Sequence, residues 1–302
     1  MNYFAWDGWS CRPLIDGKNR VFAVLAGRPR RDEHGHDSYA AVIAAATALF
    51  AHYSALATGF FGRRGSFLAV SHGVSFGGGQ KRPGNLLNSK INNSICAAMC
   101  QHWAILRIVG FTNGMFQSFS PNLHQFYKTQ MRFLFIGAPW LRRIFAETVS
   151  VFMACTFNFG PSTVTLPHVD AANLAWGWCA ITALGCFNPD IGGQLVLWHV
   201  DLNLIIRFPP GSTIIIPSAL LRHSNISVQQ GETRYSFTQF TAGGLFRWVY
   251  NGSCTDKAFY LSATAVQIEQ READRAQRWE SGLKMFQVWN PKTRTFESQT
   301  VS

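Results

Sequence analysis

The chain has 302 residues, of which 47% are hydrophobic and 14% aromatic. This composition excludes an intrinsically disordered protein, and the length allows one or two domains with a sizeable core. Lysine and arginine outnumber aspartate and glutamate by 27 to 16, which gives a net charge of +11. This excess favours a polyanionic partner such as nucleic acid, and the alternative is that it serves solubility alone.

The first half of the chain, from about residue 20 to 148, predicts a layer of helices with few strands. The patterns indicate strands at 21–25 and 67–71, helices at 39–58, 92–109 and 123–135, and a short helix near 141–146. Residues 39–61 carry no full charge and are long enough to cross a bilayer. Alanine dominates them and polar residues interrupt them, so we predict a buried helix and no membrane span.

From Val149 the pattern changes to short strands separated by turn signals, expected at 151–158, 162–168, 178–186, 194–199, 203–208, 212–216, 220–226 and 232–241. Eight such strands suit a jelly roll, also called a double-stranded β-helix. A charged helix at about 262–286 follows, with an apolar stripe of Ala265, Ile268, Ala276, Trp279 and Leu283. The expected fold class is α+β, with one domain over 1–302 made of the helical layer, a core at 149–260 and a C-terminal helix and tail at 261–302.

The seven cysteines are an odd number, scattered, and mostly in apolar surroundings. This usage predicts free thiols in a reducing compartment rather than a disulfide framework. Cys96 and Cys100 stand four residues apart, but no second Cys/His pair at zinc-site spacing accompanies them.

Two histidines and one aspartate form the strongest candidate for a metal site. His168 and Asp170 stand two residues apart at the end of an expected strand, so their side chains project from one face. His223 lies on a later expected strand. Two imidazoles and one carboxylate are the ligand set of non-haem Fe(II) oxygenases. We therefore predict His168, Asp170 and His223 as the metal ligands and the catalytic centre.

Two other clusters contain the residue types of a metal site. His199 and Asp201 form a second His-Val-Asp triplet, but His223 lies 53 residues after Asp170 and only 22 after Asp201. The strands between the first pair and a distal histidine need roughly 40 residues, so we expect a structural role for the second triplet. The run from Glu33 to Asp37 contains two histidines without a distal partner, and we interpret it as a solvated loop.

Arg234 and Ser236 are candidates for binding an anion. In a strand Arg234, Ser236 and Thr238 share one face, while Tyr235, Phe237 and Gln239 share the other. A buried arginine is costly without an anion that satisfies it. The carboxylate of 2-oxoglutarate is such a partner for Arg234, so the residues by themselves favour an Fe(II)/2-oxoglutarate oxygenase.

The chain from about Arg20 to Phe286 resembles the fungal branch of the TET/JBP dioxygenases, the ten-eleven translocation and base-J-forming enzymes. The resemblance rests on Ser75–Leu86, Thr156–Pro161, Pro167–Cys179, Phe208–Thr213, Arg222–Asn225 and Gly231–Phe240. It implies a double-stranded β-helix, Fe(II), 2-oxoglutarate, and oxidation of a methylated base in double-stranded DNA. The resemblance implies 5-methylcytosine as the base and 5-hydroxymethylcytosine as the first product, with further oxidation and N6-methyladenine as open alternatives.

By the same resemblance, His168, Asp170 and His223 match the iron ligands, and Arg234 with Ser236 matches the 2-oxoglutarate clamp. Asn173 matches an asparagine that contacts the target base, although it could instead cap a turn. The target nucleotide would flip out of the duplex. Candidates for phosphate contacts are Arg63, Arg64, Lys81, Arg82, Arg142 and Arg143.

Two other functions remain open on the sequence. The same fold serves protein hydroxylases of the prolyl type, and a non-catalytic DNA-binding paralogue could descend from a dioxygenase. The first nine residues show no pattern of a secretory signal, and a DNA substrate would imply a nuclear location. The oligomeric state cannot be inferred from the sequence.

Overall fold

The computed structural model describes residues 2–59, 64–198 and 203–299. Its helices are α1 (Ser38–Ser54), α2 (Lys90–Gln101), α3 (Trp103–Phe119), α4 (Pro121–Gly137), α5 (Gly243–Tyr250), α6 (Asp256–Ser262) and α7 (Ala265–Leu283). Its strands are β1 (Asn2–Phe4), β2 (Arg12–Ile15), β3 (Val21–Gly27), β4 (Leu68–Ser75), β5 (Gly84–Asn85), β6 (Ala154–Phe159), β7 (Cys179–Cys186), β8 (Leu195–Trp198), β9 (Leu204–Ile206), β10 (Thr213–Ile216), β11 (Arg222–Asn225), β12 (Thr233–Phe240), β13 (Gln287–Asn290) and β14 (Thr295–Ser298).

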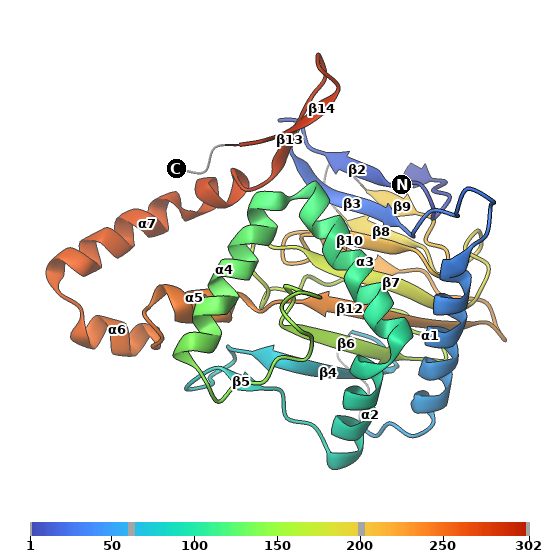
Figure 1. Ribbon diagram of the computed structural model, residues 1–302, viewed down its shortest axis with the longest axis horizontal. Coiled ribbons are helices and arrows are strands. Elements are labelled where there is room, and N and C mark those ends of the chain that lie inside the picture. The colour runs from blue at the N-terminus through green and yellow to red at the C-terminus, as the bar shows by residue number, and fades with distance from the viewer. Residues whose placement is uncertain (1, 60–63, 199–202, 300–302) are drawn as a thin grey trace.

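Two sheets and a C-terminal hairpin contain these strands (Figure 1). The large sheet has the order β2-β3-β10-β7-β12-β6-β4-β5, and the small sheet has the order β1-β9-β8-β11. From β7 onward the chain passes to the small sheet for β8 and β9, returns for β10, crosses again for β11 and returns for β12. Neighbouring strands are antiparallel except β1 with β9. The molecule therefore mixes helices with extensive antiparallel sheet, as expected for the α+β class.

Side chains alternate between the two faces of the large sheet. Phe157, Tyr235 and Phe237 pack against α1, α2 and α3 in one buried apolar cluster. Ser236 and Thr238 line a cavity on the opposite face, together with residues of the small sheet. This is the alternation that the sequence of β12 predicts. It gives the sheet one face for stability and one face for a site.

The expected helical layer is present, with two differences. The helix predicted at 92–109 is two helices that meet at His102, whose backbone is extended and whose Nδ1 accepts from the amide of Ala104. The short helix predicted near 141–146 is wrong, because this segment forms a loop. Asn85 binds both backbone groups of Arg142 through its side chain, and a helix would need those groups itself.

Residues 38–54 form α1, which buries Tyr39, Val42 and Phe50 against the large sheet rather than in a bilayer. In the described part of the chain no single helix is long and apolar enough to span a membrane. Only α2 and α3 together meet that test, as a pair bent by 66°.

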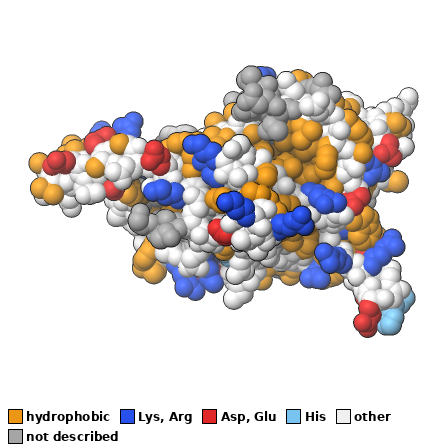
Figure 2. Space-filling view, turned by 90° about the horizontal axis from the view of Figure 1, so that it is seen from above, with side chains coloured by type: hydrophobic (Ala, Val, Ile, Leu, Met, Phe, Trp, Pro, Cys, Tyr) orange, Lys and Arg blue, Asp and Glu red, His pale blue; other side chains and the backbone are white. Residues whose placement is uncertain are grey.

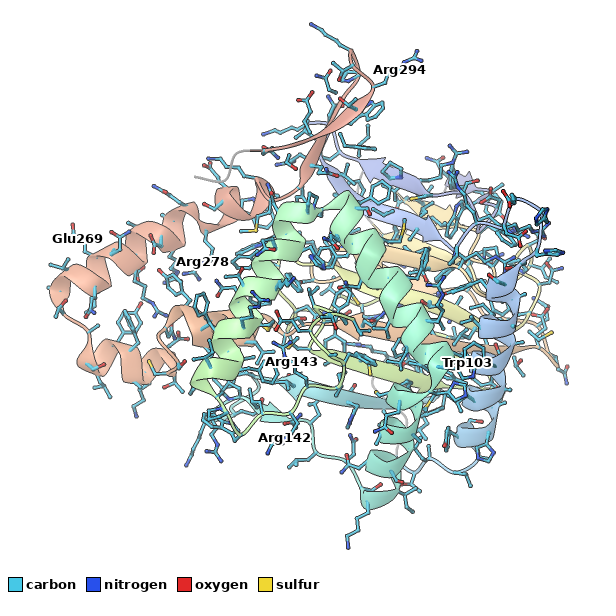
Figure 3. The ribbon with its side chains drawn as sticks, in the orientation of Figure 1. Trp103, Arg142, Arg143, Glu269, Arg278 and Arg294 are labelled. Carbon is cyan, nitrogen blue, oxygen red and sulfur yellow. The ribbon has the colours of Figure 1, made fainter. Side chains whose placement is uncertain are left out.

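The C-terminal helices project from the sheets as an arm (Figure 1). The helix expected at 262–286 is present as α7, with α6 before it, but its apolar stripe is not buried: Trp279 is 45% exposed. Polar contacts hold the arm instead. Arg271 donates to Asn251 and Asp256 and lies over the ring of Phe259. Figure 3 shows Glu269 at the far end of this arm.

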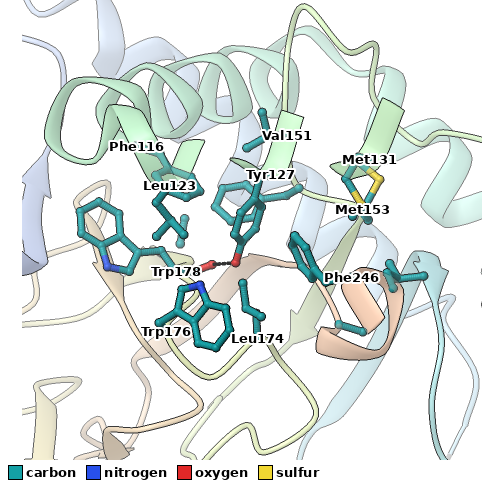
Figure 4. Close-up of a cluster of buried hydrophobic side chains, with 14 of the residues drawn as sticks. Phe116, Leu123, Tyr127, Met131, Val151, Met153, Leu174, Trp176, Trp178 and Phe246 are labelled. Atoms are coloured by element: carbon teal, nitrogen blue, oxygen red, sulfur yellow. Dashed lines mark hydrogen bonds between the residues drawn. The ribbon is translucent and has the colours of Figure 1, made fainter. Parts of the chain in front are cut away.

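A second apolar cluster joins α3 and α4 to the middle of the large sheet (Figure 4). Phe116 stacks on Phe152, meets Tyr127 edge to face, and contacts the indole of Trp178. The hydroxyl of Tyr127 reaches the backbone carbonyl of Trp178 at 3.5 Å. The cluster fixes the segment that leads from Asp170 into β7.

His124 on α4 lies inside this region and predicts a pH dependence of stability. It is 6% exposed, packs on Phe116, and lies 3.1 Å from Asn113 Oδ1. Burial, with a smaller contribution from Lys128, lowers the pKa of His124 from 6.5 to about 4. Between these values only the unfolded chain binds the proton, so the free energy of unfolding falls as the pH drops from 6.5 towards 4.

We expect this loss to be on the order of 2–3 kcal/mol, because one pKa unit corresponds to about 1.4 kcal/mol. Urea denaturation of the wild type and of His124→Gln at pH 7.5 and 4.5 measures it. The glutamine variant should lose clearly less stability than the wild type between the two pH values. An equal loss in both proteins would contradict the assignment.

Candidate metal and co-substrate site

Backbone pairing brings the first and last predicted ligands together. The strand predicted at 162–168 does not form, but His168 and His223 form an isolated antiparallel bridge. The amide of each donates to the carbonyl of the other, at 3.0 and 2.9 Å. The amide of Asp170 donates to the carbonyl of Ser218 at 2.9 Å. Both sides of the site are thus fixed by main-chain hydrogen bonds.

The three side chains converge on one point. One ligand atom from each of His168, Asp170 and His223 lies within 4.8 Å of the other two. His168 Nε2 is 3.8 Å from Asp170 Oδ1, and the two imidazole centroids are 4.4 Å apart. Elsewhere in the described residues no other group of three such side chains comes this close. This His-Asp-His group has the size of a metal site.

Each imidazole is held with Nε2 free to bind an ion. His168 Nδ1 lies 2.7 Å from the carbonyl of Leu166, and His223 Nδ1 lies 2.8 Å from that of Leu221. A carbonyl only accepts, so Nδ1 carries the proton and Nε2 keeps its lone pair. Burial lowers the pKa of both rings, against the opposing effect of Asp170. Both imidazoles are therefore neutral at pH 7, as metal ligands must be.

Arg234 is completely buried and incompletely satisfied. Its NH1 donates to the carbonyl and hydroxyl of Thr163 at 2.7 and 3.0 Å, while Nε and NH2 have no hydrogen-bond partner in the described structure. Burial lowers the pKa of Arg234 to about 10, so it stays a cation at neutral pH. A buried cation with two free donor nitrogens fits the carboxylate of 2-oxoglutarate.

A cavity of about 290 Å³ lies between the two sheets at this point. The predicted metal ligands line it on one side, and Ser236 lines it on the other. Arg234 is not in its wall but stands two residues before Ser236 on the same face of β12. The remaining lining residues are Arg64, Phe67, Ala69, Ser71, Thr156, Asn158, Thr165, Ile181, Leu195, Asn225 and Thr238.

Arg64 is a site residue whose position the sequence does not reveal. Its NH2 lies 2.6 Å from Asp170 Oδ1, an ion pair whose angles fall outside hydrogen-bond geometry. The arginine side chain is 55% exposed and the aspartate side chain 10%. The sequence analysis offers Arg64 only as a phosphate contact. The pairing joins segments about a hundred residues apart, and no local pattern carries that information.

Asn173 lies beside the site rather than in the cavity wall. Its amide nitrogen donates to Ser218 Oγ at 3.2 Å, and its backbone amide donates to the carbonyl of Asp170 at 2.8 Å. These bonds are those of a residue that stabilises the turn after Asp170. Contact between Asn173 and a target base stays a prediction.

No family model and no curated protein matches the chain. Among the solved structures that match it, NgTET1 in complex with 5mC DNA is 13% identical, with a TM-score of 0.47, over 80% of this chain and 83% of that one.

An oxidoreductase of the 2OG-Fe(II) oxygenase family from Burkholderia pseudomallei is 17% identical, with a TM-score of 0.33, over 70% of this chain and 92% of that one. A Pseudomonas putida prolyl-4-hydroxylase is 15% identical, with a TM-score of 0.35, over 67% of this chain and 86% of that one. We infer the substrate of this chain from the site rather than from similarity at this level.

The other sequence candidates are accounted for as follows. His199, Asp201 and Arg63 lie outside the described residues. The segment from Glu33 to His36 is exposed, as expected for a solvated loop. All seven cysteines are free thiols, as predicted, and Cys96, Cys100, Cys155 and Cys179 are buried.

Proposed function

We propose that this chain is an Fe(II)/2-oxoglutarate-dependent dioxygenase that oxidises a methylated base in DNA. The observation that carries the proposal is the pre-oriented His-Asp-His group beside a buried arginine that lacks an anionic partner. The donor set is that of a non-haem Fe(II) centre, and Arg234 matches a bidentate carboxylate. Neither feature is needed by a purely structural sheet.

The strand order supports a double-stranded β-helix core. The strands β6, β7, β10 and β12 lie adjacent in the large sheet, and β8, β9 and β11 lie adjacent in the small sheet. The bridge between His168 and His223 adds an eighth segment beside β11. Consecutive strands thus wind between two sheets that enclose the cavity. We infer one catalytic domain in which α1 to α4 support the large sheet.

His168, Asp170 and His223 would hold the metal, and Arg234 with Ser236 would hold the far carboxylate of 2-oxoglutarate. Bound Fe(II), with 2-oxoglutarate and O₂, supplies the oxidising power for a methyl C–H bond. The protein orients the ligands through the carbonyls of Leu166 and Leu221, and its two sheets limit access of water to the cavity.

Support for a DNA substrate comes from charge and from the sequence resemblance to the TET/JBP enzymes. Lys and Arg side chains spread over the face seen in Figure 2, with fewer acidic ones among them. Lys81, Arg82 and Arg142 are exposed, and Figure 3 shows Arg142 near the end of α4. Arg143 is less available, because it pairs with Glu147 and lies over Phe135. A DNA substrate would also imply a nuclear site of action.

Two surface loops would form part of the DNA-binding face. The backbone of Arg142 is hydrogen-bonded to Asn85, and the guanidinium of Arg82 lies 4.9 Å from the ring of Trp140. The glycines 77–79 between them and β4 all have positive φ and open surroundings. A phosphate backbone could therefore approach this loop closely.

The proposal predicts base oxidation that depends on iron and 2-oxoglutarate. Purified protein is incubated with duplexes that contain 5-methylcytosine or N6-methyladenine, and the nucleosides are analysed by mass spectrometry. We expect 5-hydroxymethylcytosine with the first duplex and a loss of product when Fe(II) is chelated. Binding should weaken about a thousandfold between 50 and 200 mM salt if six phosphates are contacted.

If succinate forms but no modified base is detected, the assignment as a dioxygenase stands and the proposal of a DNA substrate is overturned. In that case a protein hydroxylase becomes the better description, and proline-containing peptides are the next substrate to test. Binding of the duplex without succinate would indicate a non-catalytic DNA-binding protein.

A further inference from the structure

One wall of the cavity is polar across three neighbouring strands. The register pairs Ser236 of β12 with Asn158 of β6, and in the next row it pairs Thr238 with Thr156 and Thr156 with Ser71. All five side chains line the cavity. A sheet face enclosed by a second sheet ordinarily carries apolar side chains. This wall is therefore suited to a polar ligand.

Asn158 determines which way the hydroxyl groups of this wall point their protons. Its Nδ2 lies 3.0 Å from Ser236 Oγ and 3.4 Å from Thr238 Oγ1. An amide NH₂ group carries two hydrogens and accepts none, so both hydroxyl oxygens act as acceptors towards it. Each hydroxyl then keeps its own proton for another partner. Ser236 and Thr238 thus offer two O–H donors to the cavity.

These donors lie next to the buried cation. Arg234 shares the face of β12 with Ser236 and has two nitrogens without a partner. An ionised carboxylate accepts hydrogen bonds and donates none, so it matches an arginine flanked by hydroxyl donors. A wall of hydroxyl acceptors would instead repel it.

We propose that Asn158 is a positioning residue that makes this wall selective for the carboxylate end of the co-substrate. It acts through Ser236 and Thr238 and coordinates no metal. The inference rests on the proposed function in one respect, which is that the ligand is 2-oxoglutarate.

The variant Asn158→Asp tests the direction of these hydrogen bonds with almost no change in shape. A carboxylate at this position accepts, so both hydroxyls would donate to it and turn their lone pairs to the cavity. The measurement is calorimetric titration of 2-oxoglutarate into protein saturated with Mn²⁺. We expect Asn158→Asp to bind at least about 30-fold more weakly than the wild type, and Asn158→Ala about fivefold more weakly.

Asn93→Asp is the control for the added charge. Asn93 is exposed near the start of α2, outside the cavity, and its side chain donates to the carbonyl of Asn88. The affinity of this variant for 2-oxoglutarate should stay within about threefold of the wild type, as for a change outside the clamp. Lowering the pH should restore affinity to Asn158→Asp alone, because a protonated carboxyl can donate again.

The outcomes separate this inference from the proposed function. If wild type and Asn158→Asp bind 2-oxoglutarate equally, or if Asn93→Asp loses as much affinity, Asn158 has no positioning role. Should Asn158→Asp fail to fold, Asn158→Ala decides alone, and a loss below twofold overturns the inference. A wild-type protein that binds Mn²⁺ but no 2-oxoglutarate overturns the proposed function itself.

Discussion

Asp170→Ala should remove metal binding and 2-oxoglutarate turnover while leaving the fold intact. Loss of a group that only orients a metal ligand already lowers metal affinity about 10- to 100-fold. Loss of the ligand itself should therefore lower metal affinity at least about a thousandfold. Stability should change little. The Oδ1 atom of Asp170 forms no hydrogen bond in the described structure, and its ion pair is with Arg64, whose side chain is 55% exposed, where such a pair contributes little.

Metal affinity measured by calorimetry, succinate formation and urea denaturation together test this expectation. Asp190→Ala is the matched control, because Asp190 is 59% exposed and, among the described residues, its side chain forms an ion pair with Arg207 alone. It should keep both metal binding and turnover. Full turnover by Asp170→Ala would remove the site assignment, and unfolding of that variant would show that the carboxylate has a structural role instead.

Arg234→Met should raise stability and abolish the response to 2-oxoglutarate. Methionine fills a similar volume without a buried charge, and replacing an incompletely paired buried ion by an apolar side chain often stabilises by about 1–4 kcal/mol. The methionine cannot bind a carboxylate, so the concentration of 2-oxoglutarate needed for turnover should rise at least about a hundredfold. The requirement for DNA should not change.

Urea denaturation with and without 2-oxoglutarate measures both effects. At a hundredfold excess over its Kd, 2-oxoglutarate should stabilise the metal-loaded wild type by about 2.7 kcal/mol and Arg234→Met not at all. Arg275→Met, on the exposed face of the C-terminal arm, is the control and should respond like the wild type. A destabilised Arg234→Met that still gains stability from 2-oxoglutarate would contradict the clamp.

Much of the core follows from the sequence because strand periodicity is a local property. The run at 178–186 is mainly apolar and bounded by turn signals, and residues 234–238 alternate between polar and aromatic side chains; these runs become β7 and β12 with nearly the predicted bounds. The same alternation places Ser236 and Thr238 on the inner face, which only requires that residues two apart share a side. The spacing of His223 from Asp170 also favours the first His-Val-Asp triplet over the second, whose role stays a prediction because it lies outside the described residues.

What the sequence misses depends on contacts between distant segments. The apolar spacing at 141–146 resembles that of a helix because Leu141 and Phe145 are buried. The segment is a loop, because the side chain of Asn85, from a distant part of the chain, binds its backbone. The apolar spacing in α7 predicts a buried stripe, but the helix lies on a projecting arm that Arg271 fixes by polar contacts. The sequence analysis also does not predict β1, β2 and the hairpin of β13 and β14, because strands of three or four residues are too short to show a clear period.

The same limit applies to the site. That His168 and Asp170 point to one side can be predicted, because they stand two residues apart and alternation fixes their common side. The positions of Arg64 and Thr163 cannot, since each is set by packing against a segment far away in the chain. The sequence predicts Asn158 only as part of a strand. Its two hydroxyl partners, Ser236 and Thr238, are determined by the register between β6 and β12.

The central claim is that His168, Asp170 and His223 bind a single metal ion, and crystals soaked with Fe(II) or Mn²⁺ under argon test it most directly. The anomalous difference map should show one strong peak about 2.1 Å from Nε2 of both histidines and from a carboxylate oxygen of Asp170, the usual range for such ligands. A peak elsewhere, or well-ordered side chains with no peak between them at saturating metal, would contradict the account.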